Sequence, residues 1–457
     1  MFRFILTLLL LPFSAWGKQP NVLFIAVDDL RPLLGCYGDS TVKTPNFDRL
    51  ASRSSVFQKA FCNIPVCGAS RASIMTGLRP SAKRFLRYDT RVERDAPEAT
   101  DLARHFRENG YLSLSYGKVL HHPDDRADSW SERPWRPDYP DIQGPPVNGR
   151  DYQTLENQTI IAALNKEKAL PWEKGELSDD SYFDGQTTAR AVQFLSNYSG
   201  EKPYFLAVGY FKPHLPFNAP AKYWDLYDPS QFQLPENYAS PEDVPEEALH
   251  QWRELRTRYF GVPKKGPLPP AMARRLLHGY HACISYIDAL LGRLLDSVEG
   301  QDTIIVLWGD HGFNLGEHGL WCKHSNFLTS LHVPLFISTP GQSDRRDLTG
   351  VAELVDVFPT LCDLTGTPRP SQLQGRSLLP LINGQATEVD GNAIAHWRGG
   401  ITLKTPTHAY TQWEDQKGER RAEMFYSHLK DPAENWNLAP TPEAESLIPF
   451  YQTKLEE

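Results

Sequence analysis

Two pairs of polar side chains directly follow apolar runs of the 457-residue sequence. One pair follows residues 21–27, and the other follows the run that begins at residue 303. The four residues are Asp28, Asp29, Asp310 and His311. Open α/β sheets bind ligands at the carboxyl ends of their strands, and carboxylates with an imidazole suit a divalent cation. Asp28-Asp29 alone would also fit a solvated turn or a helix N-cap, so the cation site depends on both pairs.

A cysteine lies at a position suited to anion chemistry. Cys67 stands just before residues 70–77, which we expect to form a short helix. A side chain at a helix N-terminus meets free N–H groups and the positive end of the helix dipole, and both favour an anion. A buried structural cysteine is the alternative, because cysteine is among the most often buried residues.

The apolar periodicity predicts the elements that would hold these side chains. Short aliphatic runs predict strands at residues 21–27, 112–116, 204–208, 303–307 and 334–338. Helical spacing predicts helices at residues 99–108, 184–195 and 272–298. This alternation is typical of an α/β fold in which a large, mostly parallel or mixed sheet is sandwiched by helices.

Three regions depart from this alternation. Residues 122–149 and 218–270 are rich in proline and polar residues, which is typical of long surface excursions that line a cleft. Beyond residue 370, short β-like runs at 401–403, 408–413 and 424–426 predict a small C-terminal α+β subdomain. We therefore expect a main domain at residues 18–370 and a subdomain at 371–457.

Residues 1–17 have the features of a cleavable export signal. The basic Arg3 precedes an apolar run at residues 4–12, and small residues follow at Ala15 and Gly17. The apolar run is shorter than the ~20 residues that a membrane-spanning helix needs, and no later segment reaches that length. The sequence thus predicts a secreted or periplasmic protein without a membrane span. Six cysteines in so long a chain do not make a disulfide scaffold, although export permits a bridge or two.

The overall charge excludes one class of partner. The chain has 48 Lys and Arg against 56 Asp and Glu, a formal net charge of −8. A general nucleic-acid binder usually carries a basic surface, so no nucleic-acid partner is expected. A local basic pocket could still hold an anionic ligand.

Motifs spread over residues 21–438 resemble those of the formylglycine-dependent sulfatases of the alkaline phosphatase superfamily. They occur in the family's order as Asp28-Asp29, Cys67 to Arg71 with Thr76-Gly77, Gly117-Lys118-Val119-Leu120-His121, Lys212-Pro213-His214, Asp310-His311-Gly312 and Gly316-Glu317-His318-Gly319. Within the family the sequence is most similar to the iduronate-2-sulfatase branch, through Asp28-Asp29-Leu30-Arg31-Pro32, Gly35-Cys36-Tyr37-Gly38 and Lys323 with Ser325-Asn326-Phe327. The resemblance implies an alkaline phosphatase/sulfatase-like fold, with residues 18–370 as the catalytic domain.

The same resemblance implies the nucleophile and the metal. Cys67 would be oxidised to Cα-formylglycine (3-oxoalanine) by a formylglycine-generating enzyme, and the hydrated aldehyde would supply the attacking oxygen. One Ca²⁺ would be bound by that oxygen together with Asp28, Asp29, Asp310 and His311. The family motif usually reads Cys-x-Pro-Ser-Arg, whereas Ala69 stands at the proline position here, and this departure bears on maturation.

The resemblance also implies roles for five basic side chains. Arg71 and Lys118 would hold the formylglycine hydroxyls, and Lys323 would contact the sulfate. His214 would protonate the leaving alcohol oxygen, and His121 would take the proton of the second hydroxyl. Taken singly, each histidine is more often a surface or core residue, so these roles depend on the ordered set.

Together these features predict hydrolysis of a sulfate monoester on a saccharide. The expected partner is a sulfated oligo- or polysaccharide with 2-O-sulfated uronic acid, either a glycosaminoglycan or an algal polysaccharide such as ulvan. One alternative is a phosphodiester or phosphonate ester hydrolase of the same superfamily. Another is an exported carbohydrate-binding protein with a dead site, which would follow if Ala69 blocked maturation of Cys67.

Overall fold

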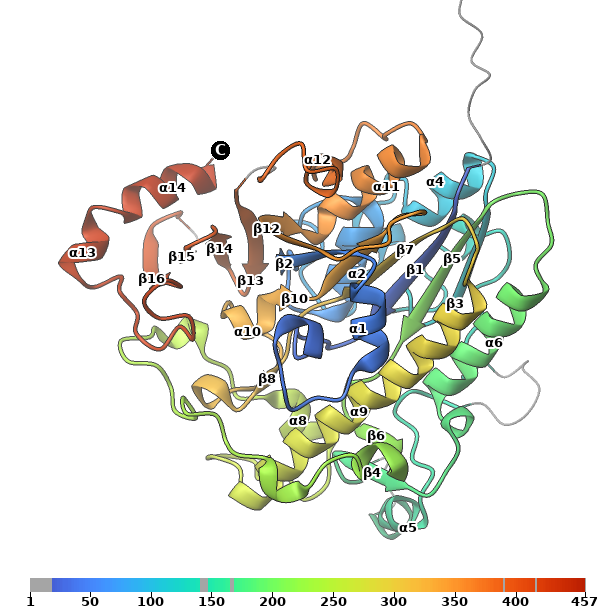
Figure 1. The fold of residues 1–457 in the computed structure, drawn as a ribbon. Coiled ribbons are helices and arrows are strands. Elements are labelled where there is room, and N and C mark those ends of the chain that lie inside the picture. The colour runs from blue at the N-terminus through green and yellow to red at the C-terminus, as the bar shows by residue number, and fades with distance from the viewer. Residues whose placement is uncertain (1–18, 140–146, 165–167, 389–390, 416, 457) are drawn as a thin grey trace, which may run out of the picture.

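A mixed eight-stranded sheet forms the centre of the protein (Figure 1). The computed structural model describes residues 19–139, 147–164, 168–388, 391–415 and 417–456. The strand order is β10-β2-β11-β7-β1-β5-β3, and β12 also pairs with β2. The strands are β1 (Asn21–Val27), β2 (Ser55–Phe61), β3 (Leu112–Gly117), β5 (Tyr204–Tyr210), β7 (Thr303–Gly309), β10 (His332–Val333), β11 (Leu335–Ser338) and β12 (Arg346–Glu353). Neighbours β3, β5, β1 and β7 are parallel, whereas β10 and β11 run antiparallel to β2.

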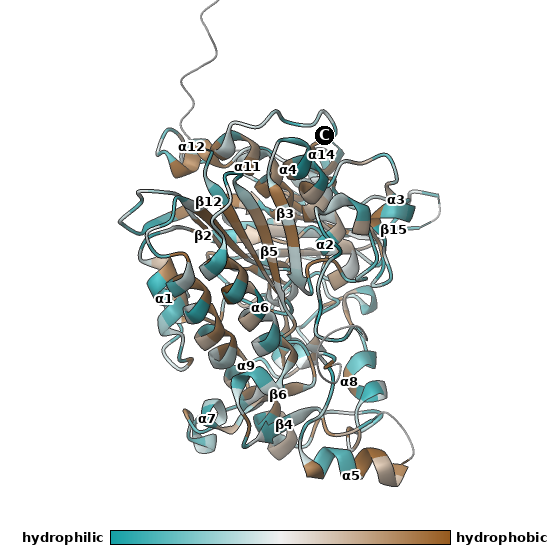
Figure 2. Cartoon of the chain, turned by 90° about the vertical axis from the view of Figure 1, so that its right-hand side faces the viewer, coloured by the Kyte–Doolittle hydropathy of each residue, from teal (hydrophilic) through white to brown (hydrophobic). Residues whose placement is uncertain are grey.

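Helices cover both faces of this sheet, as the sequence predicted. Along β1, alternate side chains enter two different cores, and residues 22–27 are fully buried. One face packs against α1 (Pro45–Ala51), α6 (Phe183–Asn197) and α9 (Pro270–Ser297). The other packs against α2 (Cys67–Thr76), α4 (Leu102–Glu108) and α11 (Val357–Thr365). Figure 2 shows the apolar strands between helices on either side. Burial on both faces explains why these strands read as continuous apolar runs.

The expected strands and helices are present, and β2 and β12 were not anticipated. The centre of β2 is Gln58-Lys59, and β12 begins with Arg346-Asp347, so neither segment is a plain apolar run. They pair in parallel with each other although they lie almost 300 residues apart. Such pairing depends on contacts that no local pattern contains.

The long segments outside the sheet form short elements of their own. In residues 147–270, β4 (Trp172–Gly175) pairs with β6 (Phe217–Pro220), and a few short helices surround this pair. These helices are α5 (Leu155–Leu164), α7 (Ala221–Trp224) and α8 (Arg253–Arg258). After β7, the hairpin of β8 (Asn314–Leu315) and β9 (Trp321–Cys322) leads to α10 (Leu328–Leu331). A further short helix, α3 (Val92–Asp95), follows α2.

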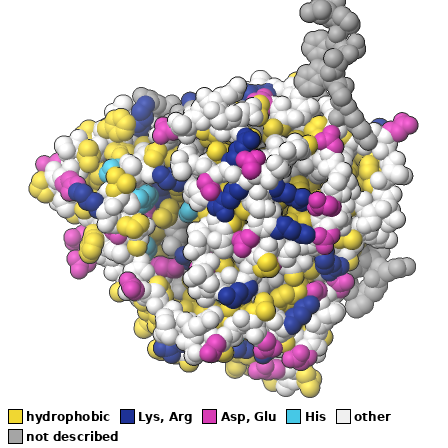
Figure 3. Space-filling model, in the orientation of Figure 1, with side chains coloured by type: hydrophobic (Ala, Val, Ile, Leu, Met, Phe, Trp, Pro, Cys, Tyr) yellow, Lys and Arg dark blue, Asp and Glu magenta, His cyan; other side chains and the backbone are white. Residues whose placement is uncertain are grey.

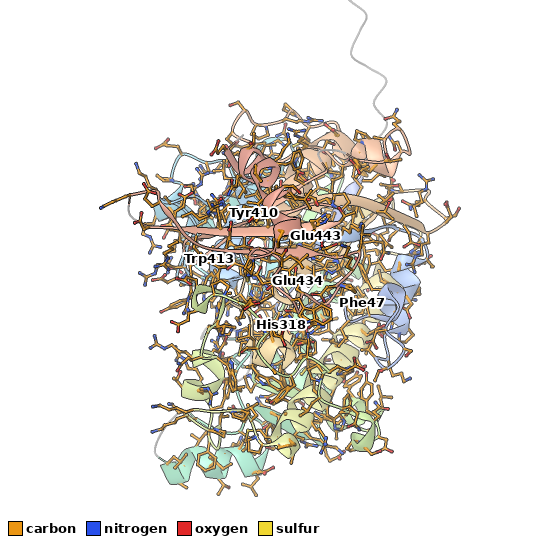
Figure 4. All side chains as sticks on the ribbon, turned by 90° about the vertical axis from the view of Figure 1, so that its left-hand side faces the viewer. Phe47, His318, Tyr410, Trp413, Glu434 and Glu443 are labelled. Atoms are coloured by element: carbon orange, nitrogen blue, oxygen red, sulfur yellow. The ribbon has the colours of Figure 1, made fainter. Side chains whose placement is uncertain are left out.

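The C-terminal region carries its own sheet. The strands β13 (Ala393–Trp397), β14 (Gly400–Lys404), β15 (His408–Glu414) and β16 (Arg420–Ser427) form an antiparallel meander. The flanking helices are α12 (Leu379–Ile382), α13 (Pro442–Glu445) and α14 (Ile448–Glu456), and α14 covers one face through Ile448 and Tyr451. Figure 4 views this region with Tyr410 and Trp413 of β15 labelled. The boundary at residue 370 stays a prediction.

This C-terminal region fixes the loop that follows β7. Glu434 accepts hydrogen bonds from Lys404 Nζ (2.6 Å) and from the backbone N–H of Leu328 (2.7 Å). His318 Nε2 donates to the carbonyl oxygen of Ala433 (2.8 Å), and Figure 4 shows His318 near Glu434. His318 thus has a structural partner here.

On the face shown in Figure 3, basic and acidic side chains are interspersed. Arg49 of α1 pairs with Asp296 of α9, and Arg53 pairs with Glu299 just beyond the ends of these helices. All six cysteines are buried and free, so the structure contains no bridge between them. Across the described residues, no helix is both long and apolar enough to cross a membrane. The predicted export signal at residues 1–17 lies outside the described residues.

Gly209 in β5 allows the backbone of β3 to pass at close range. A Cβ at this position would lie 2.0 Å from the carbonyl carbon and oxygen of Lys118. We expect Gly209→Ala to lower the free energy of unfolding by about 1–3 kcal/mol, because neither backbone can move freely. Reversible denaturant unfolding measures the change. Gly200 is exposed, and a Cβ there would meet the end of the Tyr198 side chain. The control Gly200→Ala should therefore lower the free energy of unfolding by less than about 0.5 kcal/mol. Equal losses in both variants would contradict this account.

Candidate active site

The four parallel strands end at one edge of the sheet, and most predicted site residues follow them there. Val27, the last residue of β1, pairs with Tyr210 of β5 and Gly309 of β7, so the three strands end at the same level. The neighbouring strand β3 ends at Gly117, level with Gly209. The predicted site residues follow shortly after these strand ends. They are Asp28 and Asp29 after β1, Asp310 and His311 after β7, Lys118 and His121 after β3, and His214 after β5.

The backbone turns at Asp29 so that two successive carboxylates reach the same site. In an extended strand, adjacent side chains point to opposite faces. Asp29 has a left-handed backbone (φ 60°), which aspartate tolerates better than most residues. Its N–H donates to Asp310 Oδ1 (3.0 Å), and its C=O accepts from Tyr280 (2.6 Å). These bonds stabilise the turn and link the end of β1 to the end of β7.

Helix α2 brings Cys67 to this edge, as the sequence predicted. Cys67 is the first residue of the helix and is buried, and its Sγ lies 3.2 Å from His311 Nε2. Burial, followed by the negative charge of Asp28, raises the pKa of the thiol well above its ordinary value. The unmodified thiol is therefore neutral and, as such, a weak nucleophile.

Buried ion pairs surround the cysteine. Arg71, one turn along α2, donates through Nε to Asp310 (2.8 Å) and lies 3.7 Å from Asp28. Lys118 forms an ion pair with Asp28. Burial raises the pKa of Asp28, but Lys118, His214 and Arg71 outweigh it and hold the pKa well below its usual range. Asp28 is therefore ionised although no part of it is exposed.

Four side chains offer ligand atoms to one point. One atom each from Asp28, Asp29, Cys67 and His311 lies within 4.8 Å of the others. Among the described residues, Asp28 Oδ1 and Asp29 Oδ1 are buried without a hydrogen-bond partner, although Lys323 Nζ lies 3.1 Å from Asp29 Oδ1. Buried oxygens of this kind favour a further cation beside them. A divalent cation fits this donor set of carboxylates and an imidazole. Asp310 lies outside the four, since its carboxylate accepts from Arg71 and from the backbone N–H of His311 (3.0 Å).

Lys323 and His214 meet at an acidic residue that sequence reasoning missed. Lys323 Nζ lies 3.1 Å from Asp29 and 2.9 Å from Glu254 in α8. Glu254 also lies 3.2 Å from His214 Nε2. Lys323 and His214 outweigh burial and hold the pKa of Glu254 well below its usual range, so it is ionised. One signal in the sequence pointed to Glu254, which was its place in the proline-rich segment 218–270 that was expected to line a cleft.

Two more residues complete the surroundings of the histidines. Arg150, also missed, is exposed and brings Nη2 to 3.4 Å from His214 Nε2. His121 follows β3, and its Nδ1 is buried with no hydrogen-bond partner among the described residues. Burial, reinforced by Lys118, lowers the pKa of His121 to about 2, so its imidazole is neutral at ordinary pH.

The loop that carries His214 is fixed by Asp184 of α6. Its carboxylate accepts the backbone N–H groups of Phe211 (2.6 Å) and Lys212 (2.9 Å). Lys212 Nζ in turn donates to the carbonyl oxygens of Gly149 (3.0 Å) and His214 (3.1 Å). Lys212 therefore holds the loop rather than facing the cysteine.

Asp184→Asn should loosen this loop. Its amide NH₂ would face one of the two N–H donors, leaving a buried donor unpaired at a cost of about 1–3 kcal/mol. We expect faster backbone hydrogen exchange at residues 211–216, measured by mass spectrometry, with a lower melting temperature. Asp180→Asn, which changes an exposed carboxylate paired with Arg293, should leave both unchanged. Unchanged exchange in the Asp184 variant would show that the loop is held by other contacts.

Known proteins share both the sequence and the fold. The sulfatase family model matches residues 20–367. Human iduronate 2-sulfatase is 34% identical over 421 residues, which cover 83% of this chain and 74% of the human protein. A sulfatase of Formosa agariphila is 31% identical and covers 92% of this chain and 83% of its own.

A solved structure agrees in fold. The phosphonate monoester hydrolase of Agrobacterium radiobacter superposes with a TM-score of 0.74 over 96% of this chain and 95% of the hydrolase. At 22% identity this likeness shows the fold alone. The predicted fold class is confirmed, and the sequence matches decide the family. This chain belongs to the sulfatase family and is a sulfuric ester hydrolase.

Proposed function

We propose that this protein is an exported sulfatase that removes the 2-O-sulfate from uronic acid residues of a glycosaminoglycan or an ulvan-type polysaccharide. The observation that carries the proposal is the convergence of Arg71, Lys118 and Lys323 on the buried site at Cys67. The similarity to human iduronate 2-sulfatase supports the uronic acid as substrate. The export signal predicted at residues 1–17 supports encounter with the polysaccharide outside the cell.

The cations lower the main barrier to the reaction, which is the repulsion between the ester and its nucleophile. A sulfate ester is anionic and repels an approaching oxygen nucleophile, so positive charge fixed in advance lowers the barrier. Lys323, held between Asp29 and Glu254, faces the incoming sulfate. Arg71 and Lys118 hold the reacting side chain at position 67. Because these cations are already positioned, little reorganisation accompanies the reaction.

The neutral thiol of Cys67 is the precursor of the reacting group in this proposal. A formylglycine-generating enzyme converts it to the aldehyde, whose hydrate supplies an oxygen nucleophile at the start of α2. Ala69 stands in the place of the usual motif proline, and it is buried like the rest of the helix. The maturing enzyme would therefore act on the chain before folding buries this segment.

The ligand group would hold one Ca²⁺. Asp28, Asp29, Asp310 and His311 would bind it together with the oxygen of residue 67. Asp310 would also help to remove the proton of that oxygen. The bound cation would supply positive charge beside the reacting oxygens. Asp28 and Asp29 each offer a buried oxygen that has no hydrogen-bond partner in the part of the chain that the structure describes, which supports this assignment.

Two histidines would move the protons. His214 would protonate the leaving alcohol oxygen through Nε2. The contact of its Nδ1 with the carbonyl oxygen of Leu215 (2.5 Å) supports this role, since it leaves Nε2 for the substrate. His121 is a neutral imidazole, the form that accepts a proton. It would take the proton of the second hydroxyl of residue 67.

A phosphonate or phosphodiester hydrolase is the second candidate function. It rests on the fold shared with the phosphonate monoester hydrolase. Lys323 and His214, which both contact Glu254, match the sulfatase motifs and so favour the sulfate ester. A carbohydrate-binding protein without catalysis is the third candidate, and it requires that Cys67 stays unmodified.

A paired assay with peptide mass spectrometry tests the proposed function. The enzyme is exported from a host that has a formylglycine-generating enzyme and is given a 2-O-sulfated uronic acid and an aryl phosphonate. In the wild type we expect sulfate release from the sugar and a Cys67 peptide lighter than its thiol form. The Cys67→Ala variant should show neither. Faster turnover of the phosphonate would overturn the sulfatase reading. An unmodified thiol from the native host, with glycan binding retained, would favour the binding protein.

Removal of divalent ions should destabilise the fold. Binding to the native state alone stabilises a protein by about 2.7 kcal/mol when the free ligand is at about 100 Kd. We expect Ca²⁺ to raise the melting temperature of chelator-treated protein in a concentration-dependent way. Asp29→Asn should lose this response, and the exposed control Asp302→Asn should keep it. A response that survives in the Asp29 variant would place the ion elsewhere.

A further inference from the structure

Glu254 links the two side chains that face the substrate. Its carboxylate lies 3.2 Å from His214 Nε2 and 2.9 Å from Lys323 Nζ, through separate oxygens. The three residues come from α8, from the loop after β5 and from the loop after β9. Its side chain keeps 16% of its surface exposed, whereas those of His214 and Lys323 are almost fully buried. Glu254 therefore stands at the outer side of both.

The backbone around Glu254 fixes its direction. Trp252, which precedes α8, has a left-handed backbone (φ 43°), a conformation that a bulky residue rarely adopts. The Arg256 guanidinium lies over the Trp252 ring at 3.6 Å, and Leu255 is buried. Strain of this kind persists only where surrounding contacts outweigh it, and it is concentrated at functional sites.

The hydrogen bonds of His214 define which nitrogen can carry a mobile proton. Nδ1 lies 2.5 Å from the carbonyl oxygen of Leu215, which only accepts, so Nδ1 is the donor of that bond. Nε2 faces the ionised carboxylate of Glu254, which also only accepts. The Leu215 carbonyl and Glu254 would both accept from a His214 protonated on Nδ1 and Nε2, which is the form that a general acid needs, whereas the Arg150 guanidinium, 3.4 Å from Nε2, only donates.

We infer that Glu254 is a positioning residue for leaving-group protonation. Its carboxylate holds the acidic Nε2–H of His214 and the ammonium of Lys323 in fixed positions at the outer side of the site. This inference rests on the proposed sulfatase function. As the S–O bond to the alcohol breaks, its electron pair goes to the alcohol oxygen. A hydroxyl oxygen of the hydrated residue 67 forms the new bond to sulfur and gives its proton to the Asp310 carboxylate. The alcohol oxygen takes the proton from Nε2 and leaves a neutral imidazole.

Charges on several sides act on the His214 proton. Burial, and next the ammonium of Lys323, lower the pKa of His214 to about 3, whereas Glu254 and then Asp28 oppose this shift. The Arg150 guanidinium also lies close, with Nη2 3.4 Å from His214 Nε2. Glu254 is the acceptor in direct contact with Nε2. A bound sulfate would offset the charge of Lys323 and so act in the same direction as Glu254.

A series of aryl sulfates isolates the proton transfer. A nitrophenolate leaves without a proton, whereas a poor leaving group such as unsubstituted phenol needs one. We expect Glu254→Gln to lower kcat/KM for phenyl sulfate by about a hundredfold, and for 4-nitrophenyl sulfate by less than about threefold. The slope of log kcat/KM against phenol pKa should become steeper. Glu254→Asp should restore part of the loss.

Matched variants separate this role from general damage. Glu246→Gln makes the same change on the exposed part of the same excursion and should keep the wild-type slope. His214→Gln should give the steep slope alone, and adding Glu254→Gln to it should change little. Equal losses across all esters, or an unchanged slope in Glu254→Gln, would overturn the inference. A matured wild-type enzyme that cleaves no sulfate ester would instead overturn the proposed function.

Discussion

The site depends on burying three carboxylates at one edge of a sheet. Asp28, Asp29 and Asp310 have no exposed surface, and an ionised carboxylate in the interior is costly unless opposite charge lies beside it. Each of them faces a cation: Lys118 and Arg71 at Asp28, Lys323 at Asp29, and Arg71 at Asp310. The cations hold only the pKa of Asp28 below its usual range, whereas burial raises the pKa of Asp29 and that of Asp310. Removing one of these cations would leave its carboxylate as an uncompensated charge in the interior. The folded site is therefore a single electrostatic unit.

This requirement explains much of the surrounding architecture. The cations come from segments far apart in the chain: the end of β3, the first turns of α2 and the loop after β9. The C-terminal sheet contacts that last loop, since Asn326 donates to Thr402 (2.9 Å) and His324 stacks on Trp397. The C-terminal subdomain thus supports the position of Lys323 although it supplies none of the ligands. Scaffold contacts of this kind determine how accurately a site is preorganised.

The charges also divide the site into two layers. In the inner layer, burial and Asp28 keep the Cys67 thiol neutral, so the unmodified side chain is a weak nucleophile. In the outer layer, Glu254 joins His214 to Lys323. Glu254 and Arg150 come from long segments outside the central sheet, which vary most readily between relatives on one scaffold.

The sequence by itself determined the α/β class, the strands that carry Asp28 and Asp310, and a short helix close to Cys67, because local apolar periodicity and motif order encode these features. The helix was expected at residues 70–77, whereas it begins at Cys67 itself. It did not reveal β2 or β12, whose polar residues interrupt the pattern and whose pairing spans almost 300 residues. Nor did it reveal Glu254, which lies in a proline-rich stretch without a motif. Its role follows from its distances to His214 and Lys323, and distances between segments far apart in the chain exist only once the tertiary structure has formed.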